Sequence, residues 1–395
     1  MFIAYPLPIW YRIVAVRLTS GRCCSVLAMR WLGSLLMLGW AGAGLAQTAS
    51  PLTPVQLTPS VWYVQGLTAL GSSANQNFIS NAAFIVTAQG VVVIDALGSP
   101  ALAQQLVEAI RKVTPQPITH VIVTHYHADH VYGLQVFRAL GARILAHRAA
   151  RSYLNSDTAR LRLQASRQEL APWINSNTEL VDADEWLDTE RELDLGGVRL
   201  QIKHVGPSHT PEDLVVYLPQ QRLLFAGDLV FRARIPFVGQ ADSRRWIAAL
   251  DSLLAMDTAL IVPGHGPVSA SAREDLQLTR DYLSYLRNAM GRAATNMDPF
   301  EEAYAATDWS RFESLPLFRL ANRMNAYNTY LLLGQVKCCP QAATWTQWAR
   351  WPGAACCSGA RCCWPPVQAG QQQQTCRWRA PCRSIWPLRW RAACR

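Results

Sequence analysis

The chain has 395 residues, half of them hydrophobic, and a formal net charge of +10. That length and composition permit a large core. The positive charge belongs to the two ends, since residues 29–334 carry a net charge of −2. A nucleic-acid channel needs Lys and Arg clustered on the binding face, so we expect no nucleic-acid partner. All eleven Cys also lie in the ends, which excludes a disulfide framework or a thiolate metal ligand in the middle.

The first predicted element is an export signal over residues 29–46. Met29 and the Arg after it open a run of about 16 uncharged residues, too short for a membrane span of about 20. Gly44 and Ala46 occupy the −3 and −1 positions of a small-residue cleavage site. We expect translation to begin at Met29, with residues 1–28 upstream of the true start, and a periplasmic or secreted product without stable membrane insertion. An uncleaved N-terminal anchor is the alternative.

Short β-branched runs alternate with amphipathic stretches between residues 51 and 296, which predicts an α/β fold with sheets covered by helices. We expect strands at Ala82–Val86, Val91–Ile94, Ile118–Thr124, Val198–Ile202, Leu214–Leu218, Leu223–Phe225 and Leu260–Val262. We expect helices at Ala101–Val113, Val131–Leu140, Ala149–Leu170, Arg244–Leu254 and Ala272–Met290.

The last hundred residues divide into two parts. Residues 297–334 have a helical pattern and predict an extension of the catalytic domain rather than a second one. Residues 335–395 hold nine of the eleven Cys and seven of the fifteen Trp, without an acidic residue or a periodicity. Evolved disorder is poor in aromatic residues, so a frameshifted or unfolded tail is the preferred interpretation. A Cys-rich metal or redox tail is the alternative.

The strongest chemical signal is the run from His125 to His130, which follows an apolar strand. Three imidazoles and one carboxylate lie within six residues there, at His125, His127, Asp129 and His130. Imidazole and carboxylate ligands together suit zinc. Alternate residues His125 and His127 can reach one ion, while Asp129 and His130 turn toward a second as the strand gives way to helix.

Three further candidate ligands follow predicted strands downstream. They are His209, Asp228 and His265, and each is preceded within a few residues by a Gly that permits a sharp turn. A single His of this kind is usually an ordinary hydrogen-bonded residue. The recurrence of such residues at several strand ends predicts a shared metal site. His120, His147 and His204 have no place in the pattern and are interpreted as partly buried histidines.

These motifs resemble the successive motifs of the metallo-β-lactamase superfamily, over about residues 59–296. The resemblance implies an αββα sandwich with the site at one edge of two sheets, followed here by the helical extension. It places a first ion on His125, His127 and His209, and a second on Asp129, His130 and His265. Asp228 would bridge both, as in the glyoxalase II-like branch. Asp95 and Thr124 would support the ligands from behind, although Asp95 is also a candidate helix cap.

The chemistry that follows is hydrolysis by a metal-activated water. Two Zn²⁺ lower the pKa of a bridging water toward neutrality, and Asp129 is the candidate residue to orient the hydroxide and move a proton. The expected substrate is a small molecule with a β-lactam, thioester or ester carbonyl. An iron-dependent oxidoreductase similar to the persulfide dioxygenases, and a non-catalytic binding module, are the alternatives.

Two departures narrow the resemblance. Asp228 stands where zinc β-lactamases with a cysteine ligand have that Cys, and Glu212 stands where many relatives have Gly, which weakens a thioesterase assignment. With the signal sequence, the chain is similar to periplasmic SoxH-like zinc hydrolases associated with quinoprotein systems. Residues 234–239 are candidates to line the pocket. The sequence makes no prediction of the oligomeric state.

Overall fold

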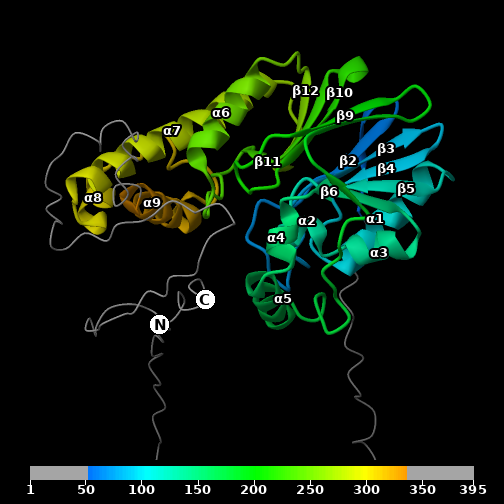
Figure 1. The fold of residues 1–395 in the computed structure, drawn as a ribbon, viewed down its shortest axis with the longest axis horizontal. Coiled ribbons are helices and arrows are strands. Elements are labelled where there is room, and N and C mark those ends of the chain that lie inside the picture. The colour runs from blue at the N-terminus through cyan, green and yellow to red at the C-terminus, as the bar shows by residue number, and fades with distance from the viewer. Residues whose placement is uncertain (1–51, 336–395) are drawn as a thin grey trace, which may run out of the picture. The chain divides into compact units, whose positions relative to one another are not determined.

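The computed structural model describes residues 52–335, in which two β-sheets pack face to face (Figure 1). The first sheet has seven strands in the order β1-β2-β3-β4-β5-β6-β7. These strands are Val55–Thr58, Val61–Val64, Ala82–Thr87, Gly90–Ile94, Ile118–Ile122, Arg143–His147 and Glu185–Leu187. The second has five strands in the order β12-β11-β10-β9-β8. In chain order, β8 to β12 are Glu190–Asp194, Arg199–His204, Leu214–Leu218, Leu223–Phe231 and Leu260–His265.

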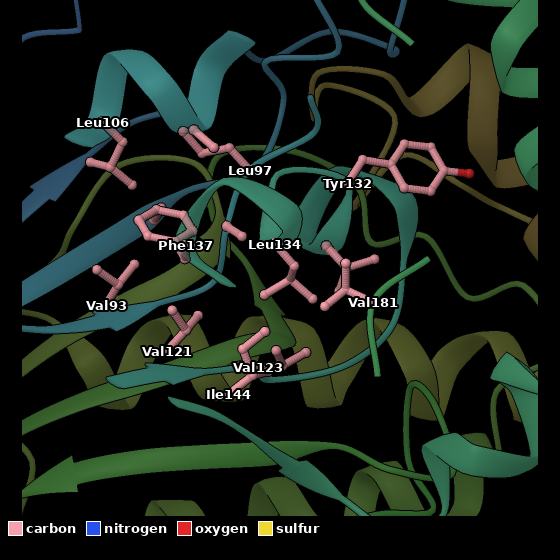
Figure 2. Packing of buried hydrophobic residues seen from close by; sticks show 14 of the residues in the cluster. Val93, Leu97, Leu106, Val121, Val123, Tyr132, Leu134, Phe137, Ile144 and Val181 are labelled. Atoms are coloured by element: carbon pink, nitrogen blue, oxygen red, sulfur yellow. The ribbon is translucent and has the colours of Figure 1, made fainter. Parts of the chain in front are cut away.

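Helices cover the outer face of each sheet, which completes the αββα sandwich that the resemblance implied. In β4, Val91 and Val93 face the outer layer, while Val92 and Ile94 face the other sheet. All are buried, as expected for a strand with apolar neighbours on both faces. The outer layer of the first sheet includes α1 (Pro100–Val113) and α3 (Leu134–Ala139). Figure 2 shows side chains of these helices, Leu106 and Phe137 among them, packed over the sheet.

The second sheet is covered by α6 (Ser243–Leu254) and α7 (Ala272–Asn296). The extension consists of α8 (Phe300–Ala306) and α9 (Phe318–Gln335) and packs against α7. Its Trp309 and Phe312 are buried in the same apolar cluster as Trp246 of α6. Tyr282 of α7 also donates a hydrogen bond to Asn322 of α9 at 2.9 Å. The predicted extension therefore shares one hydrophobic core with the second sheet and the helices that cover it.

Several predicted boundaries were wrong for local physical reasons. The helix expected at 131–140 begins later, as α3 at Leu134, and a separate short helix, α2 (Ala128–Val131), precedes it with Tyr132 and Gly133 between them. A side chain at Gly133 would lie 2.0 Å from the carbonyl oxygen of Ala96, so this position demands glycine. The helix expected at 149–170 is divided into α4 (Ala150–Leu154) and α5 (Asp157–Glu169), because Ser156 caps α5 by accepting a hydrogen bond from Ala159 N.

Other differences concern strand lengths. β5 ends at Ile122, two residues earlier than expected, whereas β11 and β12 run further than expected and carry site residues inside them. Strands β1, β2, β6, β7 and β8 were not predicted. The export signal and the Cys-rich tail lie outside the described residues. Within residues 52–335, no helix is both long and apolar enough to cross a membrane.

Candidate metal centre

The predicted ligands converge at one edge of the two sheets. His125 and His127 follow β5, and Asp129 and His130 lie in α2. His209 lies in the loop between β9 and β10. The loop is fastened to the first sheet where Leu214 N donates to the Thr124 carbonyl at 2.9 Å. The seven side chains form two groups able to hold a metal ion, which are His125, His127, His209 and Asp228, and Asp129, His130 and His265.

The first group presents three ring nitrogens to one point. His127 Nδ1 lies 3.1 Å from His125 Nε2 and 3.0 Å from His209 Nε2. Ligands about 2.0–2.1 Å from a tetrahedral zinc ion lie about 3.3 Å from one another. The spacing of the three imidazoles therefore fits a single zinc ion.

The second group repeats this arrangement on the other side. His265 Nε2 lies 3.3 Å from Asp129 Oδ2, and His130 Nε2 lies 3.6 Å from the same oxygen. His130 Nε2 is buried and makes no well-aligned hydrogen bond, although Asp228 Oδ1 lies 3.2 Å away. A buried polar nitrogen without a partner costs free energy, and a cation would remove that cost.

Asp228 stands between the two groups and offers one oxygen to each. Its Oδ2 lies 3.3 Å from His209 Nε2, while its Oδ1 lies 3.2 Å from His130 Nε2 and 3.3 Å from His265 Nε2. Asp228 was expected after β11 but lies inside it, next to an irregularity in the pairing with β12 at Gly227. Gly264 leaves room for this carboxylate, since a Cβ there would lie 2.0 Å from Asp228 Oδ1.

Asp95 and Thr124 lie behind the ligands, where they were predicted. Asp95 accepts hydrogen bonds from Thr124 N and Thr124 Oγ1, each at 2.8 Å, and its Oδ2 lies 2.8 Å from His130 Nδ1. Thr124 Oγ1 also contacts His125 Nδ1 at 3.1 Å. The alternative role of Asp95 as a helix cap falls to Ser99, which accepts from Leu102 N. These contacts leave the Nε2 atoms of His125 and His130 facing the centre.

Burial and the carboxylates set the protonation of the imidazoles. Burial lowers the pKa of His125 well below its ordinary value and the pKa of His127 to about 3. Burial also acts to lower the pKa of His130, but the carboxylates of Asp228 and Asp129 outweigh it and raise that pKa well above its ordinary value. Metal binds the neutral imidazole, so His125 and His127 are already in the binding form, whereas His130 would release a proton when an ion binds.

The turn that carries His209 is held by residues that the sequence reasoning did not assign. Asp213 accepts hydrogen bonds from Thr210 N at 2.8 Å and Thr210 Oγ1 at 2.7 Å. Its neighbour Glu212 is buried and accepts from Tyr126 N at 3.3 Å. A Thr three residues before an Asp is a recognisable local turn signal. The Thr210 and Asp213 pair could therefore have been identified from the sequence as a support for the turn.

An aromatic and cationic wall borders the second group. The ring of Phe231 stacks on His265 with centroids 4.9 Å apart. The guanidinium of Arg234 lies 5.5 Å from the Phe231 ring centroid and 3.4 Å from His265 Nδ1.

The three histidines that were not predicted as ligands lie elsewhere. His147 is buried and stacks on His204 with centroids 3.5 Å apart. His120 is partly buried, as expected.

Comparison with known proteins decides the family. A family model described as the metallo-beta-lactamase superfamily matches residues 76–265. A metallo-beta-lactamase type 2 from Bacillus sp. (strain 170) is 30% identical over 218 residues, 54% of this chain and 76% of that protein. The chain belongs to the metallo-β-lactamase superfamily. Superfamily membership and the clustered His and Asp side chains together support a metallohydrolase.

Two further similar proteins are alkylsulfatases. A linear primary-alkylsulfatase from Pseudomonas sp. (strain ATCC 19151) is 26% identical over 237 residues, 51% of this chain and 44% of that protein. The solved structure of the inverting sec-alkylsulfatase Pisa1 from Pseudomonas sp. has a TM-score of 0.58 at 18% identity. The match covers 71% of this chain and 50% of the sulfatase chain. Residues 51–296 make up a smaller share of this chain than the match covers. The likeness is one of fold.

Proposed function

We propose that this metallo-β-lactamase superfamily member is a dinuclear zinc hydrolase of a small-molecule substrate. The observation that carries the proposal is the position of Asp228, whose two oxygens each face a separate set of imidazole nitrogens. The donors are nitrogen and oxygen atoms without sulfur, a combination that suits zinc. In the proposed site, His125, His127 and His209 hold one ion, and Asp129, His130 and His265 hold the other. Asp228 joins them.

Two zinc ions held by these residues would supply a hydroxide nucleophile at neutral pH and would polarise the substrate oxygen that becomes negative. The protein residues orient these groups. The side chain of Asp129 is 15% exposed, whereas those of His130 and Asp228 are almost fully buried. Asp129 therefore lies on the open side of the site, where it can accept a hydrogen bond from the attacking hydroxide and carry a proton to the leaving group.

The substrate that we propose carries a β-lactam, thioester or ester carbonyl. Sulfate-ester hydrolysis is a second candidate. It is favoured by the 26% identity to a linear primary-alkylsulfatase over 237 residues, and the fold likeness to a sec-alkylsulfatase over 71% of this chain is compatible with it. Both reactions need a positioned hydroxide and a polarised oxygen, and they differ in the atom attacked.

Metal content and a substrate panel test the proposal together. We expect about two zinc ions per chain, as a dinuclear site requires, in full-length protein purified without added metal. The panel pairs a chromogenic β-lactam, a thioester and a carboxylic ester with a primary and a secondary alkyl sulfate. Turnover of a sulfate alone would select the second candidate. About one iron per chain would favour the iron-dependent oxidoreductase instead. Absence of tightly bound metal would contradict the proposal.

We also propose that the enzyme acts in the periplasm or outside the cell, on the basis of the signal-like residues 29–46. The mature protein recovered from the producing cells is expected to begin at Gln47. An N-terminal peptide from upstream of Met29 would contradict both the start site and the export signal.

A further inference from the structure

Asn81 connects the first sheet to the turn that carries His265. It lies directly before β3 and is buried, with 3% of its surface exposed. Its Nδ2 donates hydrogen bonds to the carbonyl oxygens of Pro263 at 2.8 Å and Gly266 at 2.7 Å. These two carbonyls flank His265 on either side. The backbone N–H of Asn81 donates to the Gly264 carbonyl between them at 2.8 Å.

The remaining capacity of the Asn81 side chain is also used. Its Oδ1 accepts a hydrogen bond from Gly66 N at 3.0 Å. Both side-chain donors and the acceptor therefore have partners, which only an amide in this orientation provides. A carboxylate would keep the acceptor and lose both donors. An alanine would leave two buried carbonyl oxygens and one buried N–H without the partner they now have.

The two residues before Asn81 contact the same side of the metal centre. His265 Nδ1 lies 2.7 Å from the Ile79 carbonyl oxygen, which orients the ring so that Nε2 faces Asp129 and Asp228. Ser80 is fully buried, and its hydroxyl donates to the Asp129 carbonyl. The segment 79–81 thus contacts two of the three members of the second group. None of the hydrogen bonds of its side chains reaches His125, His127 or His209.

We propose that Asn81 is a positioning residue for the second metal ion, acting through the turn at His265. The inference rests on the two-ion site of the proposed function. Residues that orient metal ligands typically change metal affinity by about 10- to 100-fold when they are removed. Because Asn81 holds the backbone on both sides of His265, its loss releases the imidazole of the second site. None of the hydrogen bonds of Asn81 reaches the first site, where His125 keeps its contact with Thr124 Oγ1.

Asn325 provides a matched control within the same chain. It is also a fully buried Asn, and its Nδ2 donates to the Pro236 carbonyl at 2.7 Å and contacts Tyr282 Oη at 2.9 Å. Its Oδ1 accepts from Val238 N at 2.9 Å. It lies in α9, and although Pro236 and Val238 belong to the predicted pocket-lining stretch 234–239, its side chain contacts no member of the two groups. A general loss of packing or hydrogen bonding is therefore common to both positions, whereas the effect on the second ion is specific to Asn81.

The experiment measures stepwise zinc binding to full-length Asn81→Asp, Asn81→Ala and Asn325→Ala, by native mass spectrometry against a competing chelator. We expect both Asn81 variants to bind the first ion as the unaltered protein does and the second about 10- to 100-fold more weakly. Asn325→Ala is expected to melt at a lower temperature and to keep both affinities. The nearly isosteric Asn81→Asp provides the measurement if Asn81→Ala fails to fold.

Three outcomes overturn the inference. The first is unchanged affinity for the second ion in Asn81→Asp. The second is an equal loss of affinity for the first and the second ion in the Asn81 variants. The third is the same loss in Asn325→Ala as in the Asn81 variants. If the unaltered protein binds fewer than two ions, the proposed two-ion function fails as well, and that result is separate from any comparison of variants.

Discussion

At the scale of single residues, the site combines buried carboxylates that have different neighbours. Asp228 faces imidazoles, and although burial acts to raise its pKa, His265, His130 and His125 hold that pKa well below its ordinary value. At Glu212 the nearby imidazole of His209 also acts to lower the pKa, but its effect is outweighed. Burial, with the neighbouring Asp213, raises the pKa of Glu212 from 4.5 to about 7. Two carboxylates in one small region thus have opposite protonation preferences because of what surrounds them.

Glu212→Gln is expected to change how the stability of the metal-free protein depends on pH. The folded protein binds more protons than the unfolded chain between pH 4.5 and about 7, so the free energy of unfolding falls as pH rises through this window. Gln keeps the oxygen that accepts from Tyr126 N and removes the titration. From pH 5 to pH 8 the original protein should lose stability that the variant keeps. We expect the free energy of unfolding of the variant, relative to that of the original protein, to rise by up to about 3 kcal/mol over this range, since one pKa unit corresponds to about 1.4 kcal/mol.

Urea unfolding at the two pH values checks this expectation, with the exposed Glu313→Gln as the control. Equal pH dependence in the Glu212→Gln variant and the original protein would show that Glu212 does not titrate in that range.

Asp95→Asn is expected to lower the affinity for the second ion, because it changes which ring nitrogen of His130 carries the proton. The carboxylate of Asp95 lies 2.8 Å from His130 Nδ1 and favours a proton on that nitrogen, which leaves Nε2 free to bind metal. An amide nitrogen in place of Oδ2 would oppose that N–H and favour the proton on Nε2. We expect about 10- to 100-fold weaker binding of the second ion, the usual effect of removing such a partner. Isothermal titration with zinc measures it, and retention of both affinities would contradict the assigned role.

At the scale of elements, the centre depends on where strands end and how tightly their turns approach one another. The pairing of β11 with β12 becomes irregular around Gly227, and Asp228 follows inside the same strand. Gly264, near the end of β12, lies against the Asp228 carboxylate. Bulges at strand ends redirect side chains in this way. Two adjacent strands thereby bring the carboxylate of Asp228 within 3.3 Å of His265 Nε2.

Gly264→Ala is expected to disrupt the position of Asp228. The new Cβ would lie 2.0 Å from Asp228 Oδ1, so the carboxylate or the turn must move. We expect zinc affinity to fall by at least the 10- to 100-fold seen when ligand support is lost, measured as ions retained per chain after dialysis.

The control for Gly264→Ala is Gly334→Ala in α9, where a Cβ meets only Ala294 Cβ at 3.9 Å. Alanine favours a helix interior over glycine by about 1 kcal/mol, so that variant should be stabilised and bind zinc unchanged. Full zinc retention in Gly264→Ala would show that the turn yields without cost to the site.

At the scale of the whole described chain, the helical extension shares its core with the second half of the sandwich. Phe312 is fully buried and its ring lies 5.3 Å from that of Tyr282 in α7. The aromatic cluster continues through Trp309 to Phe318 of α9. The extension therefore contributes to the stability of the second half of the sandwich through α7, and it also contacts the loop after β11, where Ile235 N donates to the Pro316 carbonyl at 3.0 Å.

Phe312→Ala is expected to lower stability without changing metal binding. Truncating a buried Phe costs about 3–5 kcal/mol, because apolar contacts are lost and a cavity remains. Chemical unfolding should show this loss, while zinc stoichiometry at low denaturant stays at the original value. A parallel fall in zinc affinity would mean that the extension and the metal centre are coupled through α7.

The sequence by itself determined the class of fold and named the side chains that cluster in the candidate metal centre. His125, His127, Asp129 and His130 are close in sequence, so their spacing after one strand already implies a cluster. The period-two and helical patterns of the apolar residues similarly indicate sheets covered by helices. Local spacing is enough in both cases, because neighbouring residues on one element have nearly fixed relative positions.

The resemblance already implied how the ligands divide between two ions, but only the tertiary structure showed how they are supported. The two oxygens of Asp228 face different groups from a position beside the irregular pairing of β11 with β12. Asn81 meets the turn at His265 across more than 180 positions of sequence. Its amide looks like any loop Asn until the two sheets pack together. Contacts of this kind arise from the path of the backbone through the whole fold, and a local residue pattern does not encode them.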